Sequence, residues 1–155
     1  MEPTAESLAA LQALIDRSVA TARPAAADSL AYGPRQMSAA EFLEFWQSVR
    51  LVAMATATSA GSPHIAPVHA RLDGTTLRLV VYDNTLRRAD IAANPRVAFT
   101  TWSADGAAAI LYGRAREVPN SERDARPAQS GRARRLVELE VRLTRIYAMR
   151  PPDRG

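Results

Sequence analysis

The hydrophobic positions near the N-terminus recur at helical spacing. Between residues 4 and 20 the apolar residues lie three and four positions apart, at Leu8, Leu11, Ile15 and Val19. This spacing places them on one face of a helix, with Thr4 as its N-cap. Residues 21–37 are alanine-rich and interrupted by Pro24, Gly33 and Pro34, so the sequence predicts a linker or strap there.

A second helix is predicted to begin after Ser38. The sequence Ser38-Ala39-Ala40-Glu41 is a capping box, in which the serine and glutamate side chains bind each other's backbone N–H groups. A broad apolar face follows and ends near Arg50. A third, short helix is predicted over residues 86–93, and it ends before Pro95 because the residue preceding a proline avoids helical geometry.

From residue 51 onward the hydrophobic pattern is that of strands. The clearest case lies near the C-terminus, where Val137, Leu139, Val141 and Leu143 alternate with polar residues. A period of two indicates a strand with one buried face. The predicted strands cover residues 51–58, 64–72, 75–82, 97–102 and 108–118, and the last one follows the alternation over residues 137–144. The polar, arginine-rich segment 119–135 is interpreted as a loop.

Six strands joined mostly by hairpins, with two or three peripheral helices, predict a mainly β fold. Antiparallel sheets of this kind avoid open edges by closing into a barrel. We divide the chain into an N-terminal helix and linker over residues 1–37, a barrel domain over residues 38–149, and a C-terminal tail over residues 150–155. A chain of 155 residues, 47% of them hydrophobic, can bury one core of this size.

The composition narrows the chemistry. There is no cysteine, which excludes disulfides, thiolate nucleophiles and cysteine-ligated metals, and with only two histidines no metal site is expected. No apolar run approaches the roughly 20 residues of a membrane-spanning helix. The first residues lack the basic region of a secretory signal, so a cytoplasmic location is expected, with no membrane partner.

All 20 basic residues are arginines, which excludes a lysine Schiff base. The formal net charge is +4, and the segment from Arg114 to Arg135 alone carries seven arginines and three acids. Only Tyr112 lies close to this segment among the aromatic residues, so base stacking has little support. Nucleic acid is therefore an unlikely partner, and a solvated loop is the simpler interpretation.

The best candidate for a binding site is the turn that precedes the third predicted helix. Thr85, Arg87 and Arg88 bring a hydroxyl and two guanidinium groups to a helix N-terminus directly after a strand. Such a terminus favours an anionic phosphate, and arginine adds charged hydrogen bonds. The alternative is an ordinary helix cap followed by solvated arginines.

The histidines and tryptophans carry weaker signals. His64 and His69 are five residues apart in one predicted strand, so they point to opposite faces and cannot form one site within it. Each is more often hydrogen-bonded or exposed than functional. Trp46 is expected to pack in the core or an interface, whereas Trp102 could equally pack or stack on a planar cofactor.

Several short motifs occur in a specific order along the chain. They are Gly61-Ser62-Pro63, Pro67-Val68, Asp73-Gly74, Thr85-Leu86-Arg87 and Asn94-Pro95-Arg96-Val97. This ordered set resembles the pyridoxamine 5'-phosphate oxidase-like family of FMN-binding split barrels, over about residues 40–118 and a final strand at 136–149. The resemblance implies a six-stranded antiparallel split β-barrel that binds FMN over residues 38–149.

The resemblance also implies site residues. The phosphate would lie on Thr85 and Arg87, with Arg88 as a helper, and the flavin ring would lie along Pro67, Val68, Val81 and Tyr82. The family builds its site between two subunits, so a homodimer is implied, and Trp102 or the region of Arg114 could come from the partner chain. Two departures stand out: Arg87 replaces the family's lysine, and Ala66 stands where the oxidase proper has an arginine. A general member is therefore expected rather than the oxidase itself.

The function implied is that of an FMN-dependent oxidoreductase acting on a small molecule, with a nicotinamide or another electron donor. No residue demands the role of general acid or base, so none is assigned. One alternative is a reductase of the same fold that uses a deazaflavin coenzyme. Another is a non-catalytic module that binds flavin or haem.

Overall fold

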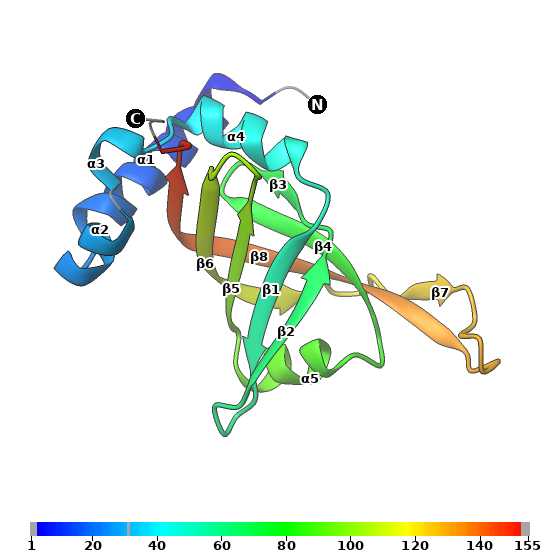
Figure 1. The fold of residues 1–155 in the computed structure, drawn as a ribbon. Helices are drawn as coiled ribbons and strands as arrows, with labels where there is room; N and C mark the ends of the chain where they lie inside the picture. Colours follow the sequence, from blue (N-terminus) through cyan, green and yellow to red (C-terminus); the bar gives the residue numbers. More distant parts are fainter. Residues whose placement is uncertain (1–2, 31, 153–155) are drawn as a thin grey trace.

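The computed structural model describes residues 3–30 and 32–152, and its fold is mainly β (Figure 1). The strands are β1 (Val52–Ala57), β2 (Pro63–Val68), β3 (Arg71–Asp73), β4 (Thr76–Tyr82), β5 (Arg96–Trp102), β6 (Ala108–Glu117), β7 (Arg123–Ala125) and β8 (Arg134–Met149). The helices are α1 (Ala5–Ala20), α2 (Pro24–Leu30), α3 (Tyr32–Arg35), α4 (Ala39–Ser48) and α5 (Leu86–Ala93).

The strands form one antiparallel sheet in the order β2-β1-β5-β6-β8-β4-β3, with β7 paired to β8 off this path. The sheet curls into a half-barrel, which confirms the predicted split-barrel fold. The order ends at β2 on one side and at β3 on the other, and β3 covers only the first part of β4, as far as Arg78. The second half of β4 does not pair with β2, although residues of both strands line one hollow. The barrel is therefore split along a seam between β2 and the second half of β4.

The described residues contain more elements than the sequence predicts. The expected strand 64–72 breaks after Val68, and the separate β3 forms a hairpin with β4 around Gly74, whose φ is +56°. The expected loop 119–135 contains β7, and with the start of β8 it projects from the barrel as an arm (Figure 1). We call residues 119–135 the arm.

The expected linker 21–37 contains α2 and α3. Pro24 does not interrupt a helix there but begins one. It stands at the first position of α2, where a backbone N–H has no helical partner to lose.

The core fills the concave side of the sheet and extends under two helices at its upper end. Val137, Leu139 and Val141 are at most 1% exposed, which confirms the alternation predicted for the last strand. From α1, Leu11, Leu14 and Ile15 join the same core. From α4, Phe42 and Trp46 do so, and the Trp46 indole N–H donates to the Ala70 carbonyl at 3.0 Å, so that α4 is fastened to the segment between β2 and β3.

Both predicted helix caps are present. Ser7 donates its backbone N–H to Thr4 Oγ1 at 3.1 Å, and Ser38 and Glu41 form the reciprocal capping box. Glu41 also accepts two hydrogen bonds from the Arg150 guanidinium. That guanidinium, together with the capping bonds, lowers the pKa of Glu41 to about 2. The first residue after β8 is thereby tied to the start of α4.

A buried carboxylate fixes α5 at the lower end of the barrel. Asp90 is 5% exposed, and its Oδ2 accepts hydrogen bonds from Thr56 Oγ1 at 2.6 Å and from His64 Nδ1 at 2.7 Å. Because an ionised carboxylate only accepts, we assign the proton to Nδ1 of His64. The Thr56 hydroxyl, followed by the His64 ring, lowers the pKa of Asp90 despite its burial. One side chain thus joins α5 to both β1 and β2.

We expect Asp90→Asn to lower the free energy of unfolding at pH 7 by about 1–3 kcal/mol, because it weakens one buried and one partly buried hydrogen bond to a charged acceptor. The pKa of Asp90 is lower in the folded chain than in the unfolded chain. Its stabilising contribution is therefore complete above the ordinary value of 3.8 and is lost as the pH falls through the folded value.

Urea unfolding of both proteins from pH 7 to pH 3 measures this difference, with Asp28→Asn in α2 as an exposed control. The gap between the parent and Asp90→Asn should narrow below about pH 4. An equal gap at every pH would contradict the role assigned to the Asp90 carboxylate.

Candidate functional site

The seam between β2 and β4 is hollowed into a groove of about 840 Å³, which we call the seam groove. This volume lies in the range of cofactor and small-molecule sites. Its walls come from the end of β2 and the segment that follows it, and from the second half of β4. The lining residues are Val49, Arg50, Pro67, Val68, His69, Ala70, Arg71, Arg78, Leu79, Val80, Val81, Tyr82, Arg87 and Glu138.

Arg87 occupies one end of the seam groove, on the first turn of α5. Its Nε is buried and has no hydrogen-bond partner among the described residues, and no ion pair joins its guanidinium to a carboxylate there. A buried N–H without a partner costs free energy comparable to a lost hydrogen bond. The position of this unpaired donor in a groove wall points to an anionic ligand.

Thr85 stands at the N-cap position of α5 but does not cap it. Its hydroxyl donates back to the Tyr82 carbonyl at 3.0 Å, and it accepts no hydrogen bond from the first turn of the helix. The positive end of the helix dipole is therefore not satisfied by the side chain that the sequence places there. Thr85 and Arg87 are close along the chain, but only Arg87 lines the groove.

Arg88 does not line the groove and instead binds two carboxylates. Its guanidinium makes two hydrogen bonds to Glu117, both 2.8 Å long, and a third to Glu122 at 2.7 Å. These two carboxylates raise the pKa of Arg88 above its usual range. The structure thus separates the two neighbouring arginines, since Arg88 joins α5 to β6 and the arm while Arg87 faces the groove.

The walls of the seam groove contain the four residues that the sequence places along a flavin ring. Pro67 and Val68 come from β2, and Val81 and Tyr82 come from β4. Val68 and Val81 are 7% and 3% exposed, so they offer little side-chain surface to a ligand. Tyr82 is 37% exposed, and the guanidinium of Arg134 from the arm lies 4.1 Å from its ring centre.

Val80 is absent from the predicted ring contacts, yet it is 44% exposed and lines the groove. Its position follows from the alternation already recognised in this strand. If Leu77, Leu79 and Val81 face the core, then Val80 must point to the other face. Val80, rather than Val81, gives β4 its apolar side-chain surface in the groove.

The opposite end of the seam groove is also basic. Arg71 pairs with Arg78 across the β3–β4 hairpin. Arg78 lies four residues along β4 from Tyr82, which corresponds to about 13 Å along the strand. Arg50 and His69 lie there as well. Arg78 is matched by Asp73, Glu138 and Glu140, whereas no ion pair involves Arg50 or Arg71 among the described residues. No motif marks this end in the sequence, because its members come from separate turns.

Trp102 does not line the seam groove. It is 69% exposed on the outer face of the sheet, in a second, mostly apolar hollow of about 400 Å³ with Leu51 and Ile65. Pro67 borders both hollows. Within one chain, Trp102 is therefore a neighbour of the groove and not part of it.

The two histidines have different surroundings, as their spacing predicts. His64 turns toward Asp90 under α5, and His69 lines the seam groove. Besides its arginines and Tyr82, the groove is lined, among the described residues, by one imidazole, His69, and one carboxylate, Glu138. The groove offers apolar walls with cationic ends, an arrangement suited to binding and orienting a planar anionic molecule.

No helix among the described residues is both long enough and apolar enough to cross a membrane.

The fold recurs in solved structures at low sequence identity. A conserved hypothetical protein from Mycobacterium tuberculosis is 19% identical with a TM-score of 0.61, over 76% of this chain and 88% of its own. A FAD-binding protein from Mesorhizobium loti is 17% identical with a TM-score of 0.56, over 72% of this chain and 94% of its own. The General Stress Protein 26 of Bacillus anthracis is 18% identical with a TM-score of 0.55, over 70% and 90% respectively.

At such identities the solved structures establish the fold alone. A search of curated proteins finds no match. The family model described as pyridoxamine 5'-phosphate oxidase, however, matches residues 38–150, which is most of the chain and includes every strand and α5. The chain therefore belongs to the pyridoxamine 5'-phosphate oxidase family, as its ordered motifs predict.

Proposed function

We propose that this protein is a flavin-dependent oxidoreductase that binds FMN in the seam groove. The observation that carries the proposal is the unpaired, buried Nε of Arg87 beside the uncapped N-terminus of α5. This combination of a fixed cation and free helix N–H groups is what a phosphate monoester requires. The groove that continues from it has the volume and the apolar walls for a flavin.

Each part of the groove has a role in this proposal. Arg87 holds the phosphate, and Thr85 adds its hydroxyl to that group. Pro67, Val80 and Tyr82 contact the ring and exclude water from it. FMN supplies hydride transfer when bound, and the protein supplies binding and orientation. No side chain is assigned as general acid or base. The basic far end at Arg50 and Arg71 favours an anionic substrate or electron donor.

We further propose that the protein acts as a homodimer through the outer face of β1, β2 and β5. Ile65 is 73%, Trp102 69% and Leu51 51% exposed, and small residues of the neighbouring strands lie between them. A contiguous exposed apolar patch of this kind is typical of an interaction site. Because Pro67 borders both this face and the seam groove, a second copy seated here would place its own residues, Trp102 among them, beside the cofactor.

We expect Arg87→Ala to weaken FMN binding by about 1.5–3 kcal/mol, the scale of a charged hydrogen bond, and Thr85→Val to cost less. Titration of the apoprotein with FMN, followed by flavin fluorescence, measures both. Arg132→Ala removes an exposed arginine of the arm and should leave FMN affinity unchanged.

Riboflavin lacks the phosphate, so its affinity should be the same for the parent and Arg87→Ala. A protein that stays colourless and takes up no FMN would overturn the flavin assignment. Displacement of FMN by a deazaflavin coenzyme at lower concentration would favour the second cofactor.

The dimer proposal is tested by sedimentation equilibrium. The parent should have twice the chain mass of 16.8 kDa. The double variant Ile65→Glu/Trp102→Glu should be monomeric, because two buried charges without partners would oppose association. Leu86→Glu changes a residue that is 66% exposed outside this face, and it should leave the dimer intact. A monomeric parent protein at micromolar concentration would contradict the proposal.

A further inference from the structure

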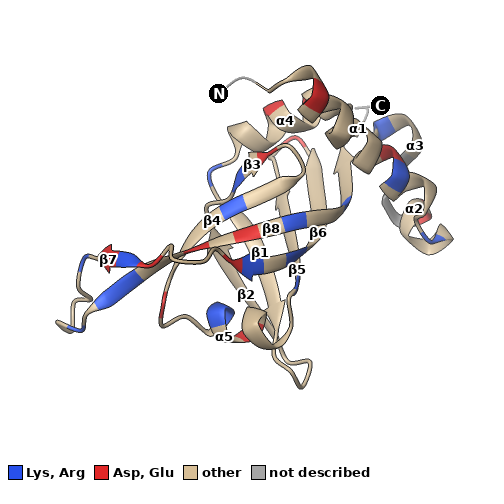
Figure 2. Cartoon of the chain, turned by 180° about the vertical axis from the view of Figure 1, so that it is seen from behind, with Lys and Arg blue, Asp and Glu red and all other residues tan. Residues whose placement is uncertain are grey.

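Four arginines gather on the outer wall of the barrel, across the sheet from the seam. The strand register makes Arg96 of β5 a direct neighbour of Arg114 of β6, and Arg114 a direct neighbour of Arg142 of β8. Arg145 follows on β8, opposite Tyr112. All four are exposed, and Figure 2 shows the basic positions on adjoining stretches of β6 and β8. We call Arg96, Arg114, Arg142 and Arg145 the arginine row.

A β-bulge brings Arg145 to this face. The pairing of β6 with β8 shifts between Tyr112 and Gly113, so that Thr144 is an extra residue on β8. Without it, Arg145 would follow the alternation of Val141 and Leu143 into the core. With it, Thr144 and Arg145 are both exposed, and the Thr144 hydroxyl donates to the Tyr112 carbonyl at 3.2 Å. Bulges commonly re-aim a side chain in this way.

The bulge depends on a glycine. A Cβ at Gly113 would lie 2.7 Å from the Arg142 carbonyl oxygen and 2.7 Å from Val141 Cγ1, both closer than real contacts allow. The backbones of β6 and β8 can therefore approach this closely only with glycine here. The chain thus keeps a specific backbone arrangement where it concentrates positive charge.

The arginine row lacks the carboxylate partners that two other arginines of the same sheet have. Arg116 binds Glu140 at 2.8 Å, and Arg78 contacts three carboxylates. By contrast, no side-chain hydrogen bond or ion pair involves any member of the row among the described residues. Like charges at directly opposite positions of neighbouring strands are destabilising. Without a ligand, the repulsion among these arginines therefore lowers the stability of the fold, and a bound anion would relieve it.

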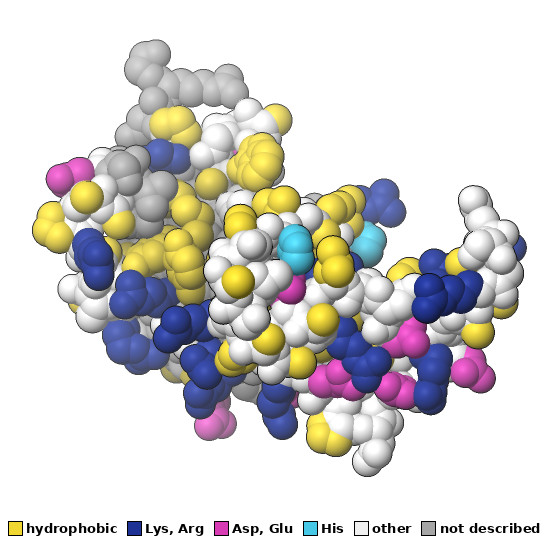
Figure 3. Space-filling model, turned by 90° about the horizontal axis from the view of Figure 1, so that it is seen from below, with side chains coloured by type: hydrophobic (Ala, Val, Ile, Leu, Met, Phe, Trp, Pro, Cys, Tyr) yellow, Lys and Arg dark blue, Asp and Glu magenta, His cyan; other side chains and the backbone are white. Residues whose placement is uncertain are grey.

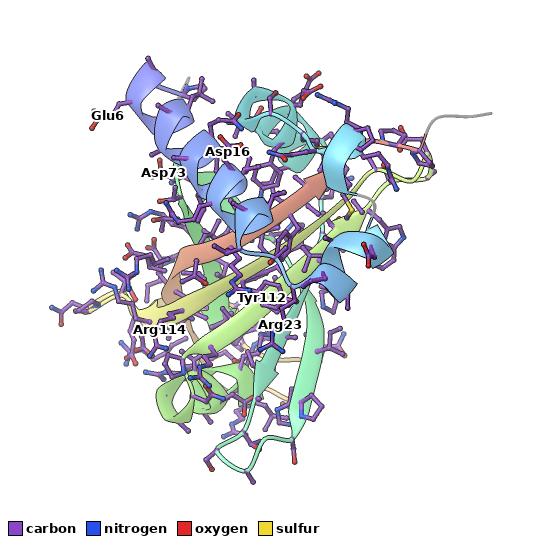
Figure 4. The ribbon with its side chains drawn as sticks, turned by 90° about the vertical axis from the view of Figure 1, so that its left-hand side faces the viewer. Glu6, Asp16, Arg23, Asp73, Tyr112 and Arg114 are labelled. Carbon is purple, nitrogen blue, oxygen red and sulfur yellow. The ribbon has the colours of Figure 1, made fainter. Side chains whose placement is uncertain are left out.

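A hollow of about 400 Å³ lies beside two members of the row, Arg114 and Arg142. Its lining residues are Pro95, Arg114, Ala115, Arg116, Glu140 and Arg142. The one carboxylate among them, Glu140, is held by Arg116 and Arg78, so it does not neutralise the row. Two residues from Arg114 along β6, Tyr112 is 43% exposed and rests edge-on against Tyr147, with 6.3 Å between ring centres. Figure 4 shows Tyr112 and Arg114 on the same face of the barrel.

We propose that the arginine row binds the oligophosphate group of a nucleotide, with Tyr112 stacking on its base. Neighbouring strands are about 4.8 Å apart, so the three cross-strand arginines span only about 10 Å. Guanidinium forks this close together match a compact, highly charged group such as a triphosphate better than a single carboxylate. Exposed tyrosine provides a stacking surface that every base can use.

The observations favour a small nucleotide over a nucleic-acid strand. Seen from below in Figure 3, basic side chains gather on one side of the barrel with few acidic ones, whereas those of the arm are mixed with acids. The positive surface is therefore local and not a continuous track along the molecule. Among the described residues, Tyr112 is the one exposed aromatic side chain that the register places beside the row, whereas strand-binding surfaces use several.

The site is separate from the seam groove. The row spans β5, β6 and β8, and the groove lies between β2 and β4 at the other side of the half-barrel. None of the four arginines lines the groove. Nucleotide binding here does not depend on the flavin proposal, and either can fail without the other.

Calorimetric titration with ATP and with inorganic tripolyphosphate at about 150 mM salt, near physiological ionic strength, tests the proposal. The double variant Arg114→Ala/Arg142→Ala should lose at least tenfold in affinity for both probes. The matched control Arg123→Ala/Arg132→Ala removes two exposed arginines from the arm, and it should change either affinity by less than twofold. Tyr112→Ala should weaken ATP binding by threefold or more while leaving tripolyphosphate binding unchanged.

Thermal unfolding without ligand keeps the test independent of folding defects. The row double variant should melt no lower than the parent, because it relieves repulsion between like charges. Three results would overturn the proposal. The first is that neither probe shows saturable binding, and the second is that the arm control loses as much affinity as the row variant. The third is that a twelve-nucleotide single strand binds more tightly than ATP and loses affinity equally in both double variants.

Discussion

The simultaneous pairing of β8 with β6 and with β4 is the constraint on which the rest of the structure depends. Residues 136–142 of β8 pair with all of β4, and residues 139–149 pair with β6. One strand of 16 residues therefore belongs to two walls of the barrel, and the sheet has to curl about it. Its inward side chains fill the core, so a change in register would expose the core and bury charges. With this strand fixed, β2 and the free part of β4 meet at the seam, and the seam groove follows from that geometry.

The anion end of the groove needs a second constraint, because α5 has only eight residues and cannot hold its position alone. Asp90 holds α5 in place through its hydrogen bonds to β1 and β2, and Arg88 holds it through Glu117 and Glu122. Both anchors lie on α5 within three residues of Arg87. Arg87 is thus left as the member of the helix whose charge is not used for holding the helix in place. A buried polar group without a hydrogen-bond partner in the fold is a strong indication of a ligand site.

The features that depend on local pattern could be predicted from the sequence. The alternation of Leu139 and its neighbours marked a last strand with one buried face, and the capping box at Ser38 marked the start of α4. The position of Arg87 followed from the strand, turn and helix that surround it. Features that depend on pairing between distant segments were missed. The sequence places Arg88 on the same phosphate as Arg87, because the partner that Arg88 has in the structure, Glu117, lies 29 residues away along the chain. The basic end of the groove at Arg71 forms only because β3 pairs back on β4, and no local pattern predicts that pairing.

The two basic features of this molecule differ in how their charges are arranged. On the arm, where the arginines are dense along the sequence, acids lie among them: Arg135 binds Glu122, and Arg134 stacks on Tyr82. On the barrel wall, the sequence shows nothing unusual, because Arg96, Arg114 and Arg142 are 18 and 28 residues apart and only the register brings them together. A run of arginines along a chain costs little, since each finds water or a nearby acid. In a row across three strands, the register holds the arginine backbones close together, so positive charge stays concentrated there and available to a ligand.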